Sequence, residues 1–319
     1  MNFPQIIFVL FAWISIVAPS IALASTGLRL NQTEANSVVL AVINAVEKDG
    51  LPPSDRTSYI KEKQRLVAFT QKHEVVLKKD LYAMICRYLA TIDADGHTMI
   101  WTREQVEQWT SFTQPSTIYD KSVAQLHSLR GKSVLVLRPP QATFVDPQAT
   151  QEYAARVSRL VDEAVHAKHP CGAVIDLTDQ VGGNAWPPLA VLQPLVTANN
   201  SARLVSRDGT RTSILSSTNL DQIHPKFSTL GSSILSKIGK EPFAIVTASK
   251  TASAGEMLAM LLRGEKRSRV FGRPTYGATT ANSAVVLPDG GTLLLSVARY
   301  SLDDGPPAMS RWQLELAAV

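Results

Sequence analysis

A short segment with the residues of an acyl-transfer nucleophile lies at 250–256 and is written Lys-Thr-Ala-Ser-Ala-Gly-Glu. The apolar run before it, 243–248, has the composition of a strand, and the run after it, 257–262, that of a helix. A serine at a strand-to-helix turn can expose its Oγ at the helix N-terminus, where backbone N–H groups and the helix dipole favour a developing negative charge. Ser253 is therefore a candidate nucleophile. Ser253-x-x-Glu256 is equally the pattern of a capping box, which satisfies unpaired N–H groups at any helix start.

Two further segments carry groups suited to such a site. The first, 176–184, follows an apolar strand-like run and contains Gly182 and Gly183. Paired glycines let backbone N–H groups approach a ligand closely, and such groups can form half of an oxyanion hole. The second is an Asp-Gly-His-Thr loop around His97, at the exit of a helical region. The alternatives are a tight strand-to-helix turn for the glycines and an ordinary loop histidine for His97.

In their residues and their order along the chain, these segments resemble the carboxyl-terminal processing (tail-specific) serine peptidases. They are most similar to the branch that includes the tricorn protease core and the interphotoreceptor retinoid-binding protein modules. The family's Asp-Leu-Arg-x-Asn-x-Gly-Gly-Asn stretch matches 176–184, and its nucleophile segment Thr/Ser-Ala-Ser-Ala-x-Glu matches 251–256. Its Gly-x-x-Thr-x-Gly segment matches 272–277, and an Asp-Gly-His loop matches 95–97. The resemblance covers roughly residues 80–305.

The resemblance implies an exported serine hydrolase that uses Ser253 as its nucleophile. The expected hydrolase is a peptidase that acts on peptides or proteins. The lysine base of the tail-specific branch falls at Ala278, so the tricorn-like branch implies His97 as the general base instead. The oxyanion would then lie against the N–H of Ala254 and that of Gly182 or Gly183. Serine, histidine and backbone donors suffice for acyl transfer, so no metal or organic cofactor is implied.

The third member of a triad stays unassigned. The tricorn-like branch supplies a glutamate just before a Gly-Val-x-Pro-Asp segment near the C-terminus, and this chain has no such segment. Asp303 and Asp304 have the context of polar turn residues, and the surroundings of Glu315 do not match. The arginine and asparagine of the family's first stretch are replaced by Thr178 and Gln180. A catalytically degenerate binding protein on the same fold, or a serine esterase, therefore stays open.

The elements that must position these groups are indicated by hydrophobic periodicity. Helices are expected from Asn31 or Thr33 to Val46, and over Tyr59–Lys72 and Glu74–Ala90. Beyond residue 130, strands are expected at 133–137, 173–177, 243–248, 283–287 and 292–298, and helices at 149–167 and 185–196. This alternation predicts an α/β core, and the resemblance implies a crotonase/ClpP-like core of β-β-α units with a helical N-terminal domain. We expect a helical domain at 25–125 and the peptidase-like core at 126–319.

The N-terminal 24 residues have the pattern of a secretory signal peptide. Residues 6–17 are almost wholly apolar, and Ala22-Leu23-Ala24 is a cleavage signal before Ser25. Counted on to Ala24, the apolar run is also long enough to span a bilayer if it stays uncleaved, which is the one case in which we expect membrane contact. A periplasmic or secreted protein is therefore predicted.

Composition and charge exclude several classes of protein. The chain of 319 residues is 45% hydrophobic and 18% charged, as in globular proteins. Its net charge of +5 is scattered and accompanies no recognition motif, so no nucleic-acid partner is expected.

Cys86 and Cys171 either form a disulfide after export or stay as two separate buried thiols. His166-x-x-His169 followed by a cysteine is not a convincing metal site.

Overall fold

A computed structural model of the chain describes residues 29–93, 96–111, 122–144, 146–165, 169–197, 199–216, 233–238 and 240–302. These residues form two compact units. The first unit contains residues 29–108 and Asn282–Ala298, and the second contains the described parts of Trp109–Ala281 and residues 299–302. The expected signal segment, 1–24, lies outside the described residues. None of the helices in the described ranges has the length and apolarity needed to cross a bilayer.

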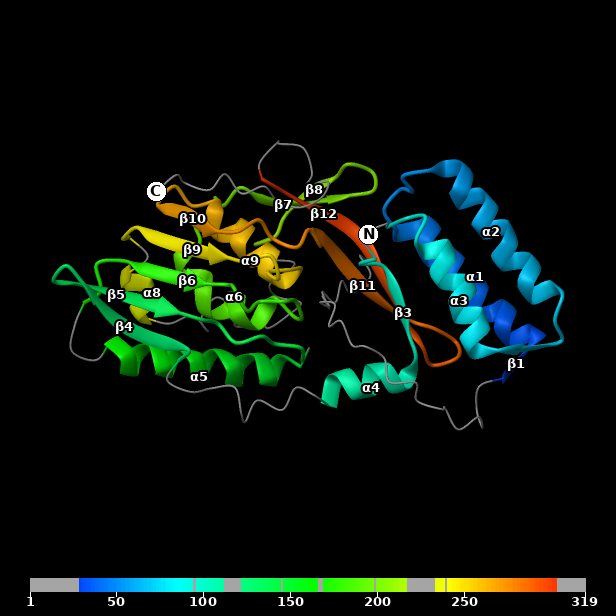
Figure 1. Cartoon of the computed structure of the whole chain (residues 1–319), viewed down its shortest axis with the longest axis horizontal. Coiled ribbons are helices and arrows are strands. Elements are labelled where there is room, and N and C mark those ends of the chain that lie inside the picture. The colour runs from blue at the N-terminus through cyan, green and yellow to red at the C-terminus, as the bar shows by residue number, and fades with distance from the viewer. Residues whose placement is uncertain are drawn as a thin grey trace. The chain divides into compact units, whose positions relative to one another are not determined.

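Three helices make up most of the first unit: Gln32–Asp49 (α1), Arg56–Gln71 (α2) and Lys78–Leu89 (α3) (Figure 1). The expected cap at the start of the first helix is confirmed. The side-chain oxygen of Asn31 accepts the N–H of Glu34 at 2.9 Å, and the Glu34 carboxylate accepts the N–H of Asn31 at 2.9 Å. This reciprocal pair satisfies two donors that would otherwise lack acceptors, and it fixes where α1 begins.

The prediction of one helix over Glu74–Ala90 is wrong at its beginning. Val75–Leu77 forms a strand (β2), and it pairs antiparallel with Arg29–Asn31 (β1). β-Branched and bulky residues suit a strand, and the partner strand comes from a distant part of the chain. Local periodicity carries no information about that partner, so α3 begins only at Lys78.

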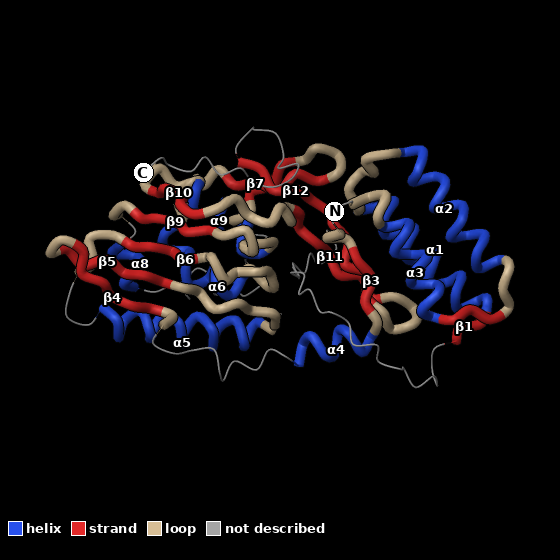
Figure 2. The backbone as a smooth tube through the Cα atoms, in the orientation of Figure 1, coloured by secondary structure: helices blue, strands red, loops and turns tan. Residues whose placement is uncertain are grey.

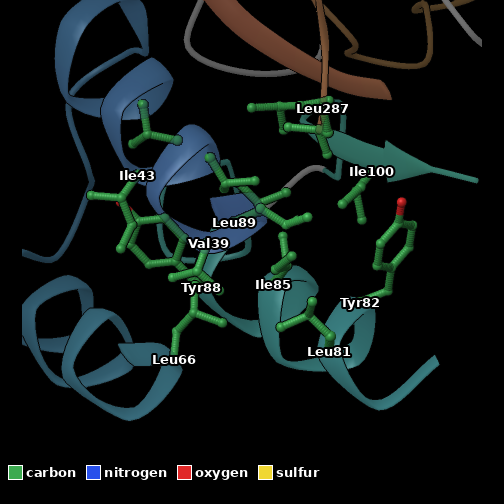
Figure 3. Close-up of a cluster of buried hydrophobic side chains, with 14 of the residues drawn as sticks. Val39, Ile43, Leu66, Leu81, Tyr82, Ile85, Tyr88, Leu89, Ile100 and Leu287 are labelled. Atoms are coloured by element: carbon green, nitrogen blue, oxygen red, sulfur yellow. The ribbon is translucent and has the colours of Figure 1, made fainter. Parts of the chain in front are cut away.

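A hydrophobic core joins the three helices of the first unit (Figure 3). Each helix contributes buried side chains, as do Ile100 and Leu287, which come from segments far apart in the sequence. The labelled members from the helices are Val39, Ile43, Leu66, Leu81, Tyr82, Ile85, Tyr88 and Leu89. Burying each large apolar side chain contributes about 1.5–3 kcal/mol, so this cluster holds the segment of residue 287 to the N-terminal helices.

The strands Thr280–Val286 (β11) and Thr292–Leu302 (β12) form a hairpin whose turn belongs to the first unit. The N–H of Leu287 donates to the carbonyl of Gly291 at 2.8 Å. Asp289 in the turn accepts the hydroxyl of Tyr82 at 2.9 Å and pairs with Lys78 at 3.1 Å. β12 also pairs antiparallel with Met99–Trp101 (β3), which is followed by Arg103–Ser111 (α4). The residues just before β3 are thereby held against the hairpin.

A five-stranded sheet is the base of the second unit, in the order β10-β9-β6-β5-β4 (Figure 2). Its strands are Ala124–Leu129 (β4), Lys132–Leu137 (β5), Ala173–Asp176 (β6), Phe243–Thr247 (β9) and Ser268–Gly272 (β10). β4 and β5 are antiparallel, and the other neighbours are parallel. Parallel strands end at the same edge of a sheet, so the segments that follow β6, β9 and β10 begin side by side.

The helices of the second unit are Pro147–Val165 (α5), Trp186–Leu192 (α6), Ser233–Ile238 (α8) and Ala254–Arg263 (α9). A 3₁₀ turn at Gln193–Leu195 (η1) extends α6, and Ala202–Ser206 (β7) pairs antiparallel with Arg211–Ser213 (β8). α5 packs on β4 and β5, and α9 packs on β9 and β10. The two prolines of α6 stand in its first turn, where no N–H is needed. The expected α/β core is confirmed.

Candidate active site

Ser253 stands between β9 and α9 with a backbone conformation that serine rarely adopts. Its φ is +60° and its ψ is −110°, and the residue is fully buried. A non-glycine residue at positive φ stores strain that the surrounding contacts must hold. Strained serines on strand-to-helix turns are typical of nucleophile elbows. The turn also places the N–H of Ala254 in the first helical turn, where donors have no intrahelical acceptor.

The side chain of Glu256 holds this turn in place. Its Oε2 accepts the N–H of Ser253 at 2.8 Å. Its Oε1 accepts the hydroxyl of Thr275 at 2.6 Å and the N–H of Gly277 at 2.9 Å. Burial raises the pKa of Glu256, and these hydrogen bonds oppose that rise. The carboxylate half of the expected capping box is therefore present, and it also anchors the segment 272–277.

That segment contacts the serine turn at two more points. The N–H of Tyr276 donates to the carbonyl of Thr251 at 2.9 Å, and the hydroxyl of Thr247 donates to the carbonyl of Arg273 at 2.9 Å. Ala278, where the related branch has its lysine, is buried and apolar. Lys250, three residues before the serine, is exposed and forms an ion pair with Asp179. Neither position supplies a buried lysine base.

The glycine pair lies in a loop that requires glycine. Gly182 and Gly183 have φ values of +129° and +103°, and a Cβ on Gly183 would overlap the carbonyl oxygen of Ala142. The same carbonyl accepts the N–H of Asn184 at 2.5 Å, and the Asn184 amide donates to the carbonyl of Phe144 at 2.6 Å. The loop is thereby fixed against the segment that follows β5.

Gln180 connects this loop to the serine turn. Its carbonyl accepts the N–H of Ala252 at 3.0 Å, and a Cβ on Gly255 would overlap it. Its side-chain amide donates to the carbonyl of Pro139. The hydroxyl of Thr251 adds a bond to the carbonyl of Leu177 at 2.9 Å. The second unit therefore brings together the segments 176–184, 250–256 and 272–277.

Asp176, at the end of β6, organises the start of the glycine loop. Its carboxylate accepts the N–H and the hydroxyl of Thr178 at 3.0 and 2.7 Å, and it pairs with Arg138 at 2.9 Å. Partial burial would raise the pKa of Asp176, but these hydrogen bonds and the Arg138 charge outweigh it and the pKa lies below its usual range. Thr178, which stands where the family has an arginine, thus donates two hydrogen bonds to the Asp176 carboxylate.

His97 belongs to the first unit, whereas Ser253 belongs to the second. The histidine is buried, and its carbonyl accepts the side-chain amide of Asn282 at 2.6 Å. Burial lowers the pKa of His97 to about 4, and the negative charge of Asp93 opposes this. The imidazole is consequently neutral at pH 7 and able to accept a proton.

Three polar residues around His97 were not singled out by the sequence: Asp93, Asn282 and Ser296. All are buried in the first unit. Asp93 stands near the histidine in the sequence, but the other two are strand residues whose proximity only the fold reveals. Asp303, Asp304, Glu315 and the signal segment lie outside the described residues.

The two cysteines are free thiols, so the disulfide is not formed. Both Cys86 and Cys171 are exposed, which corrects the alternative of buried thiols. Within the described ranges, no cluster of three His, Cys, Asp or Glu residues could hold a metal ion. His166 lies outside those ranges.

Comparison with known proteins adds sequence and fold relationships. The profile described as peptidase family S41 matches residues 140–315, which is more than half of the chain. The chain is 28% identical over 182 residues to the nisin-resistance protein of Lactococcus lactis subsp. lactis, covering 57% of this chain and 54% of that protein. The chain therefore spans about half the length of this relative.

Two solved structures share the fold. A lipoprotein from Streptococcus agalactiae superposes with a TM-score of 0.71 and 19% identity, over 94% of this chain and 95% of that one. A photosystem II D1 C-terminal processing protease superposes with a TM-score of 0.56 and 14% identity, over 88% of this chain and 92% of that one. At these identities the likeness concerns the fold, and it agrees with the fold class implied by the sequence motifs.

Proposed function

The chain belongs to peptidase family S41, and from that premise we propose that it is a serine-type peptidase with Ser253 as nucleophile and His97 as general base. The observation that carries the proposal is the conformation of Ser253. A buried serine at φ +60° before a helix is costly, and such strain persists where the nucleophile must face a helix N-terminus.

The proposed reaction proceeds through an acyl-enzyme. His97 accepts the proton of the Ser253 hydroxyl while Oγ attacks the peptide carbonyl carbon. The resulting oxyanion is stabilised by the N–H of Ala254 and that of Gly182 or Gly183. The imidazolium then returns the proton to the leaving amine as the C–N bond breaks, and water repeats the sequence on the acyl-enzyme.

The neutral state of His97 supports its role as base. With a pKa of about 4, nearly all of its imidazole is unprotonated at pH 7. Burial also lowers the basicity of the ring, so a proton transferred to it needs stabilisation from the protein. We therefore expect hydrolysis to persist at mildly acidic pH.

The proposed substrate is a peptide or protein, and the proposed location is outside the cytoplasm. The similar proteins include a lipoprotein and a nisin-resistance protein, which fit an exported peptidase. The apolar segment at 1–24 supports export on independent grounds.

A fluorophosphonate probe and a library of quenched fluorescent peptides test the proposal. We expect stoichiometric labelling and peptide cleavage by the wild type, and loss of both in Ser253→Ala. Ser268→Ala is the matched control, because Ser268 lies in the same unit and its hydroxyl donates to the carbonyl of Glu265. A folded wild type that neither labels nor cleaves would instead indicate a binding protein. Cleavage of esters alone would indicate an esterase.

A further inference from the structure

A buried carboxylate in the first unit stands four residues before the proposed base. Asp93 lies beyond the end of α3, and its carbonyl accepts the N–H of Gly96, the residue before His97, at 3.1 Å. The side chain is buried, as is that of His97. Asp93 and His97 both belong to the first unit, so their arrangement does not depend on where the second unit lies.

The Asp93 carboxylate is held in a fixed orientation. Its Oδ2 accepts the N–H of Thr98 at 2.8 Å and lies 3.0 Å from the hydroxyl of Ser296. The hydroxyl of Thr98 in turn accepts the N–H of Ser296 at 3.1 Å. Donors from two separate segments therefore hold this side chain in place.

The same network holds the backbone of His97. The Asn282 amide donates to the His97 carbonyl at 2.6 Å, and the amide oxygen of Asn282 lies 3.0 Å from the Ser296 hydroxyl. Ser296 therefore links the Asp93 carboxylate to Asn282, the residue that holds the His97 backbone. Two adjacent strands, β11 and β12, supply Asn282 and Ser296.

We propose that Asp93 is the positioning carboxylate of the site: it orients the His97 imidazole and stabilises its protonated form during the reaction. This inference rests on the proposed function. When His97 takes the Ser253 proton, a positive charge forms on a buried ring, and a fixed negative charge lowers the cost of forming it. The proton passes between serine, histidine and the leaving group. The negative charge of Asp93 acts on the His97 ring in the direction that this role requires.

The test combines kinetics with histidine NMR on the full chain. Asp93→Asn keeps the shape of the side chain and its acceptor oxygen but removes the charge. We expect kcat on a cleaved peptide to fall about a hundredfold or more while KM stays within about threefold. We also expect the pKa of the His97 ring to fall by at least about 0.5. The His97 resonances are assigned by comparison with His97→Gln. At pH 7 the nitrogen shifts should change from one neutral tautomer to a mixture.

Asn282→Ala is the matched control, because it loosens the His97 backbone without removing a charge. It should lower kcat while leaving the pKa of His97 within about 0.2 units of the wild type. Ser296→Ala, which keeps the Asp93 charge but removes one of its donors, should give a smaller shift than Asp93→Asn. This variant keeps the test informative if Asp93→Asn does not fold.

The outcomes separate this inference from the proposed function. A His97 pKa and tautomer unchanged in folded Asp93→Asn would overturn the role of Asp93 even if the wild type cleaves peptides. If Asp93→Asn does not fold, a His97 resonance unmoved in Ser296→Ala would overturn it. A wild type without peptidase activity whose His97 pKa falls in Asp93→Asn would refute the proposed function while confirming that Asp93 sets the state of the ring.

Discussion

The carboxylate of Glu256 accepts the backbone N–H of Ser253 at 2.8 Å, so a residue in the first turn of α9 holds the residue that precedes the helix. The other carboxylate oxygen receives the Thr275 hydroxyl at 2.6 Å and the Gly277 N–H at 2.9 Å. One buried side chain thereby joins the serine turn to the segment after β10. An interaction common at helix ends is used here to hold a strained backbone.

Replacement of Glu256 should destabilise the second unit. Glu256→Ala leaves the N–H of Ser253, the hydroxyl of Thr275 and the N–H of Gly277 buried without this acceptor, and we expect a loss of about 3 kcal/mol or more in the free energy of unfolding. Urea denaturation measures it. Glu107→Ala, which removes an exposed carboxylate, should cost less than about 0.5 kcal/mol. Equal losses in the two variants would contradict the anchoring role of Glu256.

The strain at Ser253 predicts an order of stability among inactive variants. Glycine adopts a φ of +60° without steric cost, whereas alanine keeps the strain. Ser253→Gly should therefore be more stable than Ser253→Ala by about 1 kcal/mol, despite the flexibility that glycine adds to the unfolded chain. Thermal unfolding of the two variants side by side provides the comparison. An alanine variant as stable as the glycine variant would show that the turn relaxes without strain.

The glycine loop makes a prediction with a matched control. Gly183 and Gly131 both have positive φ, but a Cβ on Gly183 would overlap the Ala142 carbonyl, whereas a Cβ on Gly131 would meet nothing within 4 Å. Gly131→Ala should cost only the backbone strain, about 1 kcal/mol, and Gly183→Ala about 3 kcal/mol or more. Gly183→Ala should also lose peptidase activity. Chemical denaturation and peptide cleavage assays together test this, and similar costs at both positions would speak against a tightly packed loop.

Burial of His97 predicts how stability depends on pH. The pKa of His97 is lowered from 6.5 to about 4, so below pH 6.5 the unfolded chain binds a proton that the folded chain does not. The free energy of unfolding should thus fall as pH drops from 6.5 to about 4, by roughly 3 kcal/mol from this residue. His97→Gln should flatten that part of the curve, and the exposed His73→Gln should not. Identical curves for the three proteins would mean that His97 is not buried in its neutral form.

Much of the local structure follows from the sequence because its causes are local. The cap at Asn31 and the strand-turn-helix around Ser253 each depend on neighbouring residues, and the structure has them as expected. The three motif segments after β6, β9 and β10 were recognised from their residues. Their convergence on one sheet edge follows from parallel strand order.

The structural features that the sequence does not predict depend on partners far along the chain. Val75–Leu77 is a strand because it pairs with Arg29–Asn31, and periodicity alone assigned it to a helix. Local residue types gave no sign that a hairpin from near the C-terminus would bring Asn282 and Ser296 to His97 and Asp93.

The motifs are enough to identify the family, the candidate nucleophile and the candidate base, since they record residue types at fixed spacing. The buried groups that hold these residues are visible in the fold alone. Hydrogen bonds such as that of Ser296 to Asp93, and of Thr275 to Glu256, join residues that no spacing rule connects. They form because burial leaves a polar group no water to bind, so each must find its partner within the fold.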